Sequence, residues 1–454
     1  MSKFRHRHSA PRQRKRPAAP PPSDLPPKPE LLAPAGTLDA GIAAIDHGAD
    51  AVYFGLSRFN ARERGRNLTL EQGGQLVEHA HANGAKAYVT LNTLIKESEL
   101  ADMACLLGEL LLFAPDAVIV QDLGVLRMLR RHFPELPVHA STQMGIHNSA
   151  GVEVVAGLGV QRVILQRQVT FDEIRAVQSK VQTELEVFVH GALCCSRSGA
   201  CLLSSWLGGW SGNRGKCKQP CRRRFHSSEG NGFFLSTNDL CLLDSVPELR
   251  RMGVASLKIE GRLRGVDYVT SAVRAYRMML DAEPGMEKTR IKEARRALSE
   301  SLGRKWSRGF RTEGDFDHVV QHTSLGGSGL LLGRVGKQTS DGFDIVLSRP
   351  LARGDRIRVQ PESGDEGPSL EVQHLLSQGR PAKRVPGGKT ATIGTDLDIP
   401  ANGYVFKTAN RQPDMSVRLA KLPPPTPALP LAIRVHADCL EVSVSGLGIP
   451  PWRE

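Results

Sequence analysis

The amino-acid sequence predicts an α/β protein: a (β/α)8 TIM-like barrel with a cysteine-rich insertion after its seventh strand, followed by a small antiparallel β domain. Three observations predict this fold. Short apolar runs alternate with segments of helical periodicity between residues 30 and 283. The runs are apolar at successive positions, as in parallel strands that helices cover on both faces. Eight such units in about 250 residues is the number that closes a barrel.

The eight predicted strands follow one another in chain order. They are the runs ELLAPA, DAVYFGL, KAYVTLN, DAVIVQD, LPVHAST, QRVILQR, ELEVFVHG and VASLKIEG. Helical segments such as TLEQGGQLVEHAHANGA and TFDEIRAVQSKV lie between them. Several of these segments end in Gly-Ala or Leu-Gly, which suits a glycine just after a helix. The alternative is an open doubly wound sheet, but no glycine-rich phosphate-binding fingerprint follows the first strand.

Changes in composition along the chain predict where the barrel ends and which segments follow it. The barrel spans residues 30–283, with the insertion at 192–253, and a polar helical connector follows at 284–322. Residues 323–420 alternate apolar and polar positions between Asp-Gly and Arg-Gly-Asp turns, which predicts the small β domain. Residues 421–454 are a proline-rich linker and an incomplete β segment. The sequence leaves open whether this short end is native.

The N-terminal residues 1–29 are basic and proline-rich, and we expect them to be disordered. The net charge of the chain is +13. Its first thirty residues carry eight Lys or Arg against Asp24 and Glu30, which gives +6. This tail either keeps the protein soluble or binds a polyphosphate such as RNA, since cationic arms gain affinity by releasing counterions.

Hydropathy predicts a protein with no membrane partner. No run of eighteen apolar residues occurs, and the N-terminus has no apolar secretory segment. We therefore expect a cytoplasmic location, where thiols stay reduced. Clustered cysteines in that compartment indicate a metal or a catalytic site rather than disulfides. The sequence does not indicate the oligomeric state.

Polar residues that directly follow the predicted strands are candidates for a functional site, because the chemistry of such barrels lies at the carboxyl ends of the strands. We call this end of the barrel the rim. A single polar residue there can equally cap a helix or bond a loop carbonyl. The candidates are Asn92, Thr93, Gln121, Asp122, His139, Ser141, Gln143, Gln166, Arg167, His190, Glu260 and Arg262.

Five of the eight cysteines lie between residues 191 and 225. Cysteine thiolates bind zinc or iron–sulfur clusters. The spacing of Cys194, Cys201, Cys217 and Cys221 contains only one half of a zinc knuckle pair, which favours a 4Fe–4S cluster modestly. Cys195 and Cys241 are further cysteines beside these four, so the fourth ligand of the cluster is either Cys221 or Cys241.

Basic and aromatic residues surround these cysteines. The basic residues offset the thiolate charge or hold a phosphate or carboxylate. Trp206 and Trp210 either stack on an unpaired base or cover the cluster from solvent. The basic residues are Arg197, Arg214, Lys216, Lys218, Arg222, Arg223 and Arg224.

The segment EVFVHGALCCSRSGACLLS, residues 186–204, resembles the signature of the U32 peptidase family, whose members are described as collagenase-like. Further segments resemble family landmarks in family order, among them ELLAPAG, GADAVYFG, HASTQM, GNRGKCKQPCR and LKIEGR. The resemblance covers about residues 30–420. Within the family the chain is most similar to the subgroup of 23S rRNA 5-hydroxycytidine synthases and tRNA hydroxylation proteins, because a β domain follows the barrel. The chain differs from this subgroup in its basic N-terminal tail and in its short C-terminal end.

The resemblance implies an enzyme that hydroxylates a pyrimidine at carbon 5 in rRNA or tRNA, with a 4Fe–4S cluster and prephenate. We then expect Glu260 to take or position a proton and Arg262, a bidentate donor, to bind the dicarboxylate. Alternatively, Glu260 pairs with Arg262 or a neighbouring arginine only to close the rim. The predicted catalytic residues are Glu260, His139 and Gln143, and the predicted substrate-binding residues are Arg262, Ser141, His190 and Arg197.

Two other functions stay open. The first is a peptidase, as the family name suggests. No H-E-x-x-H metallopeptidase motif occurs, but Cys194 and His190 are a conceivable nucleophile and base, although four further cysteines would then be unexplained. The second is a non-catalytic RNA-binding factor with a structural cluster.

Overall fold

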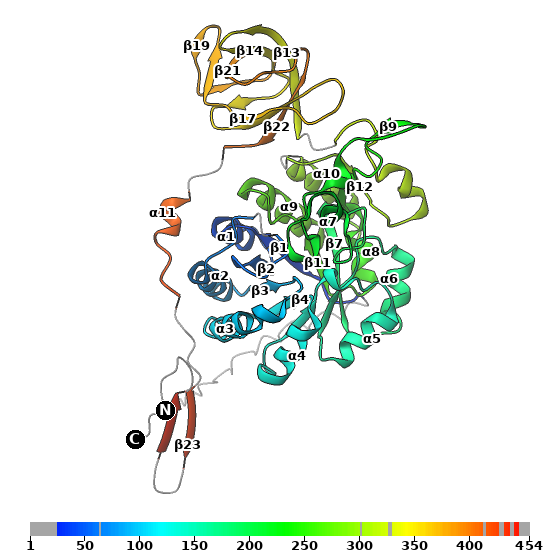
Figure 1. The fold of residues 1–454 in the computed structure, drawn as a ribbon. Helices are drawn as coiled ribbons and strands as arrows, with labels where there is room; N and C mark the ends of the chain where they lie inside the picture. The colour runs from blue at the N-terminus through cyan, green and yellow to red at the C-terminus, as the bar shows by residue number, and fades with distance from the viewer. Residues whose placement is uncertain are drawn as a thin grey trace, which may run out of the picture.

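The computed structural model describes residues 25–62, 65–299, 302–325, 329–411, 415–425, 431–435 and 440–444 (Figure 1). The predicted disordered tail therefore falls largely outside the described residues. Within the described residues, no helix combines the length and the apolar character that a membrane crossing requires.

Eight parallel strands in the described part of the chain close into the predicted barrel. Each pairs with its neighbour in sequence, and β11 closes the ring by pairing with both β1 and β7. Their residues are almost all buried, as the continuous apolar runs require. The strands are β1 (Glu30–Ala35), β2 (Ala51–Gly55), β3 (Lys86–Leu91), β4 (Ala117–Val120), β5 (Val138–Ala140), β6 (Arg162–Ile164), β7 (Glu184–Ala192) and β11 (Ser256–Ile259).

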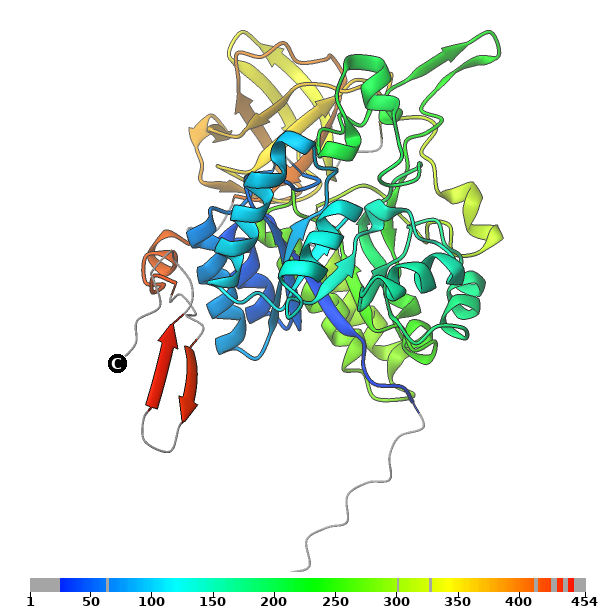
Figure 2. The same cartoon turned by 60° about the horizontal axis from the view of Figure 1, so that its bottom comes forward.

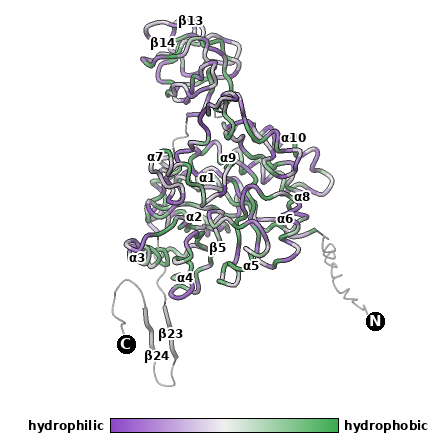
Figure 3. Tube along the Cα trace, turned by 45° about the vertical axis from the view of Figure 1, so that its right-hand side comes forward, coloured by the Kyte–Doolittle hydropathy of each residue, from purple (hydrophilic) through white to green (hydrophobic). Residues whose placement is uncertain are grey.

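Helices surround these strands, with hydrophilic and hydrophobic residues both present along them (Figure 3). Side-chain caps fix where several begin: Thr69 accepts from the Gln72 amide and Asp122 from the Val125 amide. The helices are α1 (Leu38–Asp46), α2 (Leu70–Ala82), α3 (Leu100–Leu111), α4 (Leu123–His132), α5 (Ser149–Gly157), α6 (Phe171–Gln178), α8 (Val246–Arg251) and α9 (Val266–Leu280).

The cysteine-rich insertion leaves the barrel after β7. Its strand β10 pairs antiparallel with the end of β7, and β12 (Trp306–Ser307) of the connector adds to β10. The predicted range 192–253 also includes α8, which occupies the usual place of the helix between β7 and β11. The other elements of the insertion are α7 (Leu203–Gly208), η3 (Gly212–Arg214), η4 (Pro220–Arg222), β8 (Phe225–Ser227), β9 (Gly230–Gly232), β10 (Asp239–Cys241) and η5 (Leu243–Ser245).

The connector packs on the barrel. Its helix α10 (Glu287–Leu298) contributes Ala294 and Leu298 to the barrel core, and η6 (Glu313–His318) follows β12. Ion pairing also joins the insertion to the β domain, since Arg224 Nε lies 3.0 Å from Asp365 Oδ1. The β domain and the insertion lie at the same end of the barrel (Figure 2).

The β domain has a hydrophobic core of its own. In the described residues its antiparallel strands form one sheet in the order β17-β16-β22-β13-β14-β21-β18-β19, with β15 and β20 as a separate pair. The strands are β13 (Leu330–Thr339), β14 (Gly342–Val346), β15 (Leu351–Ala352), β16 (Arg356–Gln360), β17 (Ser369–Glu371), β18 (His374–Ser377), β19 (Arg380–Pro381), β20 (Arg384–Val385), β21 (Thr390–Gly394) and β22 (Tyr404–Ala409).

The described part of the C-terminal segment contains one short helix and one hairpin. Helix α11 (Ser416–Leu419) follows the β domain. Strands β23 (Leu431–Val435) and β24 (Leu440–Val444) then pair antiparallel, as the alternating pattern of this segment predicts.

Candidate active site at the barrel mouth

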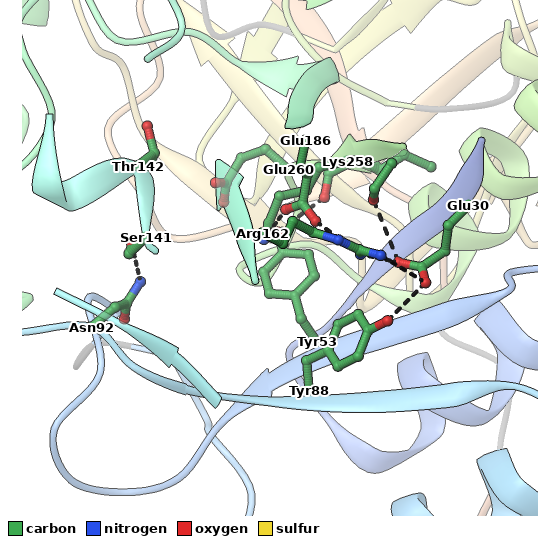
Figure 4. Close-up of polar contacts among 12 residues, drawn as sticks. Glu30, Tyr53, Tyr88, Asn92, Ser141, Thr142, Arg162, Glu186, Lys258 and Glu260 are labelled. Atoms are coloured by element: carbon green, nitrogen blue, oxygen red, sulfur yellow. Dashed lines mark hydrogen bonds and ion pairs between the residues drawn. The ribbon is translucent and has the colours of Figure 1, made fainter. Parts of the chain in front are cut away.

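The interior of the barrel contains a layer of paired charges, which we call the inner charged layer (Figure 4). It comprises Glu30, Tyr88, Arg162, Glu186 and Lys258. Arg162 Nη1 lies 2.6 Å from Glu30 Oε1, and Lys258 Nζ lies 2.8 Å from Glu186 Oε1. Tyr88 donates its hydroxyl to Glu30 Oε2 over 2.7 Å. Two carboxylates thus face two cations, so the charges of this layer are matched.

His139 lies in the same layer rather than at the mouth. Its ring packs edge-on against Tyr88 with the centroids 4.8 Å apart, and its Nδ1 has no hydrogen-bond partner. Burial, and then the charge of Arg162, lowers the pKa of His139 to about 3, so the ring is neutral at physiological pH. His139 does not line the cavities described below.

One layer closer to the rim, Glu260 follows β11 and is 9% exposed. Its Oε2 lies 2.8 Å from Arg167 Nη2 and 3.2 Å from Arg62 Nη2. Burial favours a higher pKa for Glu260, but the charges of these two arginines, of Arg262 and of Lys258 outweigh it and hold the pKa at about 2. Glu260 is therefore a carboxylate at neutral pH.

Arg262 is a buried cation whose hydrogen bonds go to neutral oxygens. Its Nη1 donates to Thr90 Oγ1 over 2.9 Å and to Asn60 Oδ1 over 3.4 Å. Burial, and then the charge of Arg62, lowers the pKa of Arg262 to about 10. Among the described residues, which leave out residues 63 and 64, Glu260 pairs with Arg62 and Arg167, and no carboxylate pairs with Arg262. We call Arg62, Arg167, Glu260 and Arg262 the mouth cluster; it has three cations around one anion.

The opposite side of the mouth is polar and neutral. Asn92 Nδ2 donates to Ser141 Oγ over 3.2 Å, and Ser141 Oγ also accepts from the Gln143 amide over 3.2 Å. Asn92 Oδ1 accepts from the Ala61 amide over 2.9 Å, which fixes the loop that carries Arg62. Ser141 and Gln143 line a cavity of about 30 Å³ together with the mouth cluster. The structure therefore brings Glu260, Gln143, Ser141 and Arg262 together.

A second cavity of about 150 Å³ lies between the mouth cluster and the insertion, and we call it the cysteine cavity. Gln143, Arg167 and Arg62 line both cavities. Arg197 also lines the cysteine cavity and donates to the Gly145 carbonyl over 3.2 Å. The cysteines that line it are Cys194, Cys195, Cys201, Cys217 and Cys221.

The cysteine cavity gathers five thiols in its lining, and thiolates are the ligands that an iron–sulfur cluster requires. In the described residues no three His, Cys, Asp or Glu side chains are arranged to hold one metal ion. A hydrogen bond from the Cys221 thiol lowers the pKa of Cys195. Cys241 lies elsewhere: it packs against the barrel core, and burial raises its pKa.

His190 does not line either of these cavities. Its ring packs against Tyr268 and Tyr276 of α9, with centroids 5.7 and 5.6 Å away, and burial lowers its pKa to about 4. In the described part of the chain, no hydrogen bond joins His190 to Cys194, and the His190 Nδ1 has no partner. A β-bulge explains this position, because the register with β11 shifts between Lys258 and Ile259 and turns His190 towards α9.

The two tryptophans of the insertion do not cover the cysteines. Trp206 is 87% exposed and Trp210 is 44% exposed, and neither lines the cysteine cavity. The Lys218 ammonium lies 3.7 Å from the centre of the Trp210 ring. The Trp206 ring is therefore open to solvent, whereas Lys218 covers one face of the Trp210 ring.

Sequence reasoning missed Arg62, Asn60 and Thr90. Thr90 lies inside the third predicted strand, before its end. Asn60 and Arg62 lie several residues after the end of the second predicted strand. A search restricted to residues directly after strands therefore excluded all three. A search of whole loops at the rim would have found the arginine-rich segment SRFNARERGRN, residues 57–67.

Proteins of known name resemble this chain. The 23S rRNA 5-hydroxycytidine C2501 synthase of Escherichia coli is 36% identical over 354 residues, which are 73% of this chain and 52% of that protein. The tRNA hydroxylation protein P1 of Bacillus subtilis is 37% identical over 268 residues, 56% of this chain and 64% of that protein. A protein of Porphyromonas gingivalis named collagenase is 31% identical over 302 residues, 62% of this chain and 72% of that protein.

The chain thus spans about half the length of the first of these relatives and 64% of the second. The profile of a single family, described as Peptidase family U32, matches residues 36–320. That range contains seven of the eight barrel strands, from β2 to β11, the mouth cluster and all five cysteines of the cysteine cavity. The chain belongs to peptidase family U32.

Proposed function

We propose that this protein is an RNA-modifying enzyme that hydroxylates a pyrimidine base at carbon 5 in rRNA or tRNA, with a 4Fe–4S cluster and prephenate as co-substrate. The surplus of buried positive charge in the mouth cluster carries the proposal. Three arginines surround Glu260, and in the part of the chain that the structure describes no carboxylate pairs with Arg262. A buried cation of this kind is stabilised by an anionic ligand, and a guanidinium binds a carboxylate in bidentate geometry.

Each residue of the site has a role in this proposal. Arg262, with Arg62, binds a carboxylate of prephenate. Glu260, ionised and held by two arginines, accepts a hydrogen bond from the base and orients it, and it takes up a proton only when a strong acid forms beside it. Ser141 and Gln143 supply neutral hydrogen-bonding groups on the opposite side.

The cluster belongs to the cysteine cavity in this proposal, held by Cys194, Cys201, Cys217 and Cys221. An iron–sulfur cluster supplies one-electron chemistry when bound, and this is the role that the proposal gives to it. Because free thiols so close together are easily oxidised, a reducing cytoplasmic location is part of the proposal. The relatives named for rRNA and tRNA hydroxylation support the choice of RNA as substrate.

The peptidase alternative finds less support in the geometry. It needs a histidine that activates Cys194, and His190 packs against tyrosines with a lowered pKa instead.

The proposed function is tested in a strain that lacks the chromosomal gene and carries it on a plasmid. Nucleosides from its RNA are quantified by mass spectrometry. We expect Glu260→Gln to abolish 5-hydroxypyrimidine, and Arg262→Ala to reduce it strongly with partial rescue by excess prephenate. Glu293→Gln, on the exposed face of α10, is the matched control and retains full modification. Full modification by both mouth variants would exclude this site.

The cofactor is tested separately by absorbance of the anaerobically purified protein. A cluster held by thiolates gives a broad band near ~400 nm. We expect Cys194→Ala, Cys201→Ala, Cys217→Ala and Cys221→Ala each to bleach it. Cys241→Ala is the control and keeps the band, because Cys241 lies outside the cysteine cavity. A colourless wild-type protein with one zinc per chain would contradict the cluster.

A further inference from the structure

A third cavity, of about 300 Å³, lies where the barrel rim meets the β domain, and we call it the vestibule. It is bordered by Ala192 and Gln219 of the insertion region, by Arg304 of the connector and by Arg358 and Thr408 of the β domain. Four separate parts of the chain therefore enclose it.

The vestibule adjoins the site described above, because the two share lining residues. Glu260 lines both the vestibule and the small mouth cavity, and Arg62 lines the vestibule and both other cavities. Gln219 and Leu263 are shared with the cysteine cavity. A nucleotide whose base enters the mouth must leave its ribose and phosphate outside, and the vestibule is the space directly outside.

The walls of the vestibule are strongly basic. Arginines 62, 264, 304 and 358 line it, and among the described lining residues Glu260 is the only carboxylate. Arg264 and Arg304 share one partner, Asp239, at 3.3 and 3.7 Å. Arg358 pairs with Glu366 at 3.3 Å, but that glutamate side chain is 67% exposed, so solvent screens the pair.

Burial, and then the charge of Arg222, lowers the pKa of Arg304 to about 10. The four arginines that line the vestibule thus bring four guanidinium groups to one cavity, and guanidinium groups bind phosphate oxygens in bidentate geometry.

We propose that the vestibule is the binding site for a backbone phosphate of the RNA next to the target nucleotide, and that Arg358 brings the β domain into substrate binding. This inference rests on the proposed function and assigns different ligands to two adjoining sites. The mouth cluster takes the small dicarboxylate, while the wider vestibule takes the phosphodiester. The vestibule suits a backbone contact because phosphate contacts position a nucleic acid without reading its sequence.

The test compares two arginines of the β domain that differ in position. Arg358 lines the vestibule, whereas Arg334, on β13, pairs with Glu362 at 3.0 Å and does not line it. Arg358→Gln, Arg358→Lys and Arg334→Gln are purified as full chains. Their affinity for a fluorescein-labelled single-stranded oligoribonucleotide is measured by anisotropy over a series of salt concentrations, and prephenate binding by calorimetry.

We expect Arg358→Gln to reduce the slope of log K against log salt by about 0.7 and to weaken RNA binding about 5-fold at ~0.1 M salt, which is the effect of one lost phosphate contact. Arg358→Lys keeps the positive charge and therefore retains most of the slope of log K against log salt. Arg334→Gln matches the wild type, and prephenate affinity is equal in all variants.

Three outcomes would overturn the inference. A wild-type slope for Arg358→Gln, with unchanged prephenate affinity, would show that the vestibule does not hold phosphate. Loss of prephenate affinity in Arg358→Gln, with an unchanged RNA slope, would assign the vestibule to the dicarboxylate. Equal losses in both variants would indicate only general electrostatics. If the wild type binds RNA but forms no 5-hydroxypyrimidine, the proposed function fails, while the slopes still decide the inference.

Discussion

The inner charged layer and the mouth cluster lie one above the other in the same barrel, yet they differ in their balance of charge. In the inner layer, Arg162 and Lys258 face Glu30 and Glu186 at 2.6 to 2.8 Å. In the mouth cluster, Arg62 and Arg167 pair with Glu260, and among the described residues no carboxylate pairs with Arg262. Buried charges with partners of opposite sign are stabilised by those partners, whereas a buried charge in excess is stabilised when a ligand of opposite charge binds. The difference separates a layer whose charges are paired within the barrel from a layer with an excess of positive charge, which is the feature on which the proposed substrate site rests.

The largest effect should come from breaking the inner layer. Glu186→Gln removes the carboxylate partner of Lys258 from a fully buried position, while Arg162 keeps Glu30 at 2.6 Å and Glu184 at 2.7 Å. We expect the free energy of unfolding to fall by about 3–5 kcal/mol in urea titrations. Glu293→Gln on the protein surface should change it by less than about 0.5 kcal/mol. A loss below about 1 kcal/mol for Glu186→Gln would mean that the inner layer is not structural.

A smaller change in the free energy of unfolding should follow from protonating Glu260 of the mouth cluster. The pKa of Glu260 is depressed from 4.5 to about 2, so its stabilisation is present above pH 4.5 and is lost as the pH falls towards 2. The shift corresponds to about 3 kcal/mol. We therefore expect wild type to exceed Glu260→Gln in unfolding free energy by about this amount at pH 6, with the difference shrinking below pH 4.5. A difference that stays constant with pH would refute the depressed pKa.

The smallest effect should come from removing the surplus cation. Arg262→Met deletes a guanidinium that has no carboxylate partner, so we expect the unfolding free energy to change by no more than about 1 kcal/mol, or to rise. Lys258→Met is the matched variant of the inner layer and should lose at least about 2 kcal/mol, because it leaves Glu186 with only Arg162 at 3.5 Å. Equal losses for both variants would remove the distinction between the two layers.

Local sequence pattern determined the barrel. Eight apolar runs became β1 to β7 and β11, because strands buried on both faces need continuous apolar residues. The same pattern located Glu260, Arg262, Ser141 and Gln143 at the mouth, because each follows the carboxyl end of a strand.

Tertiary structure decided what strand ends alone do not specify. His139 is two residues before Ser141, and since alternate residues of a strand face the same side, it points into the barrel one layer deeper. His190 faces α9 because a bulge in β7 shifts its register.

The partners of Glu260 come from distant loops, and Arg304 and Arg358 meet at the vestibule only because the connector and β domain fold back onto the rim. The sequence by itself determined which residues lie at strand ends. Which charges become neighbours, and which remain unmatched, depended on how separate loops and the second domain pack, because Coulomb interactions depend on distances in space rather than on positions along the chain.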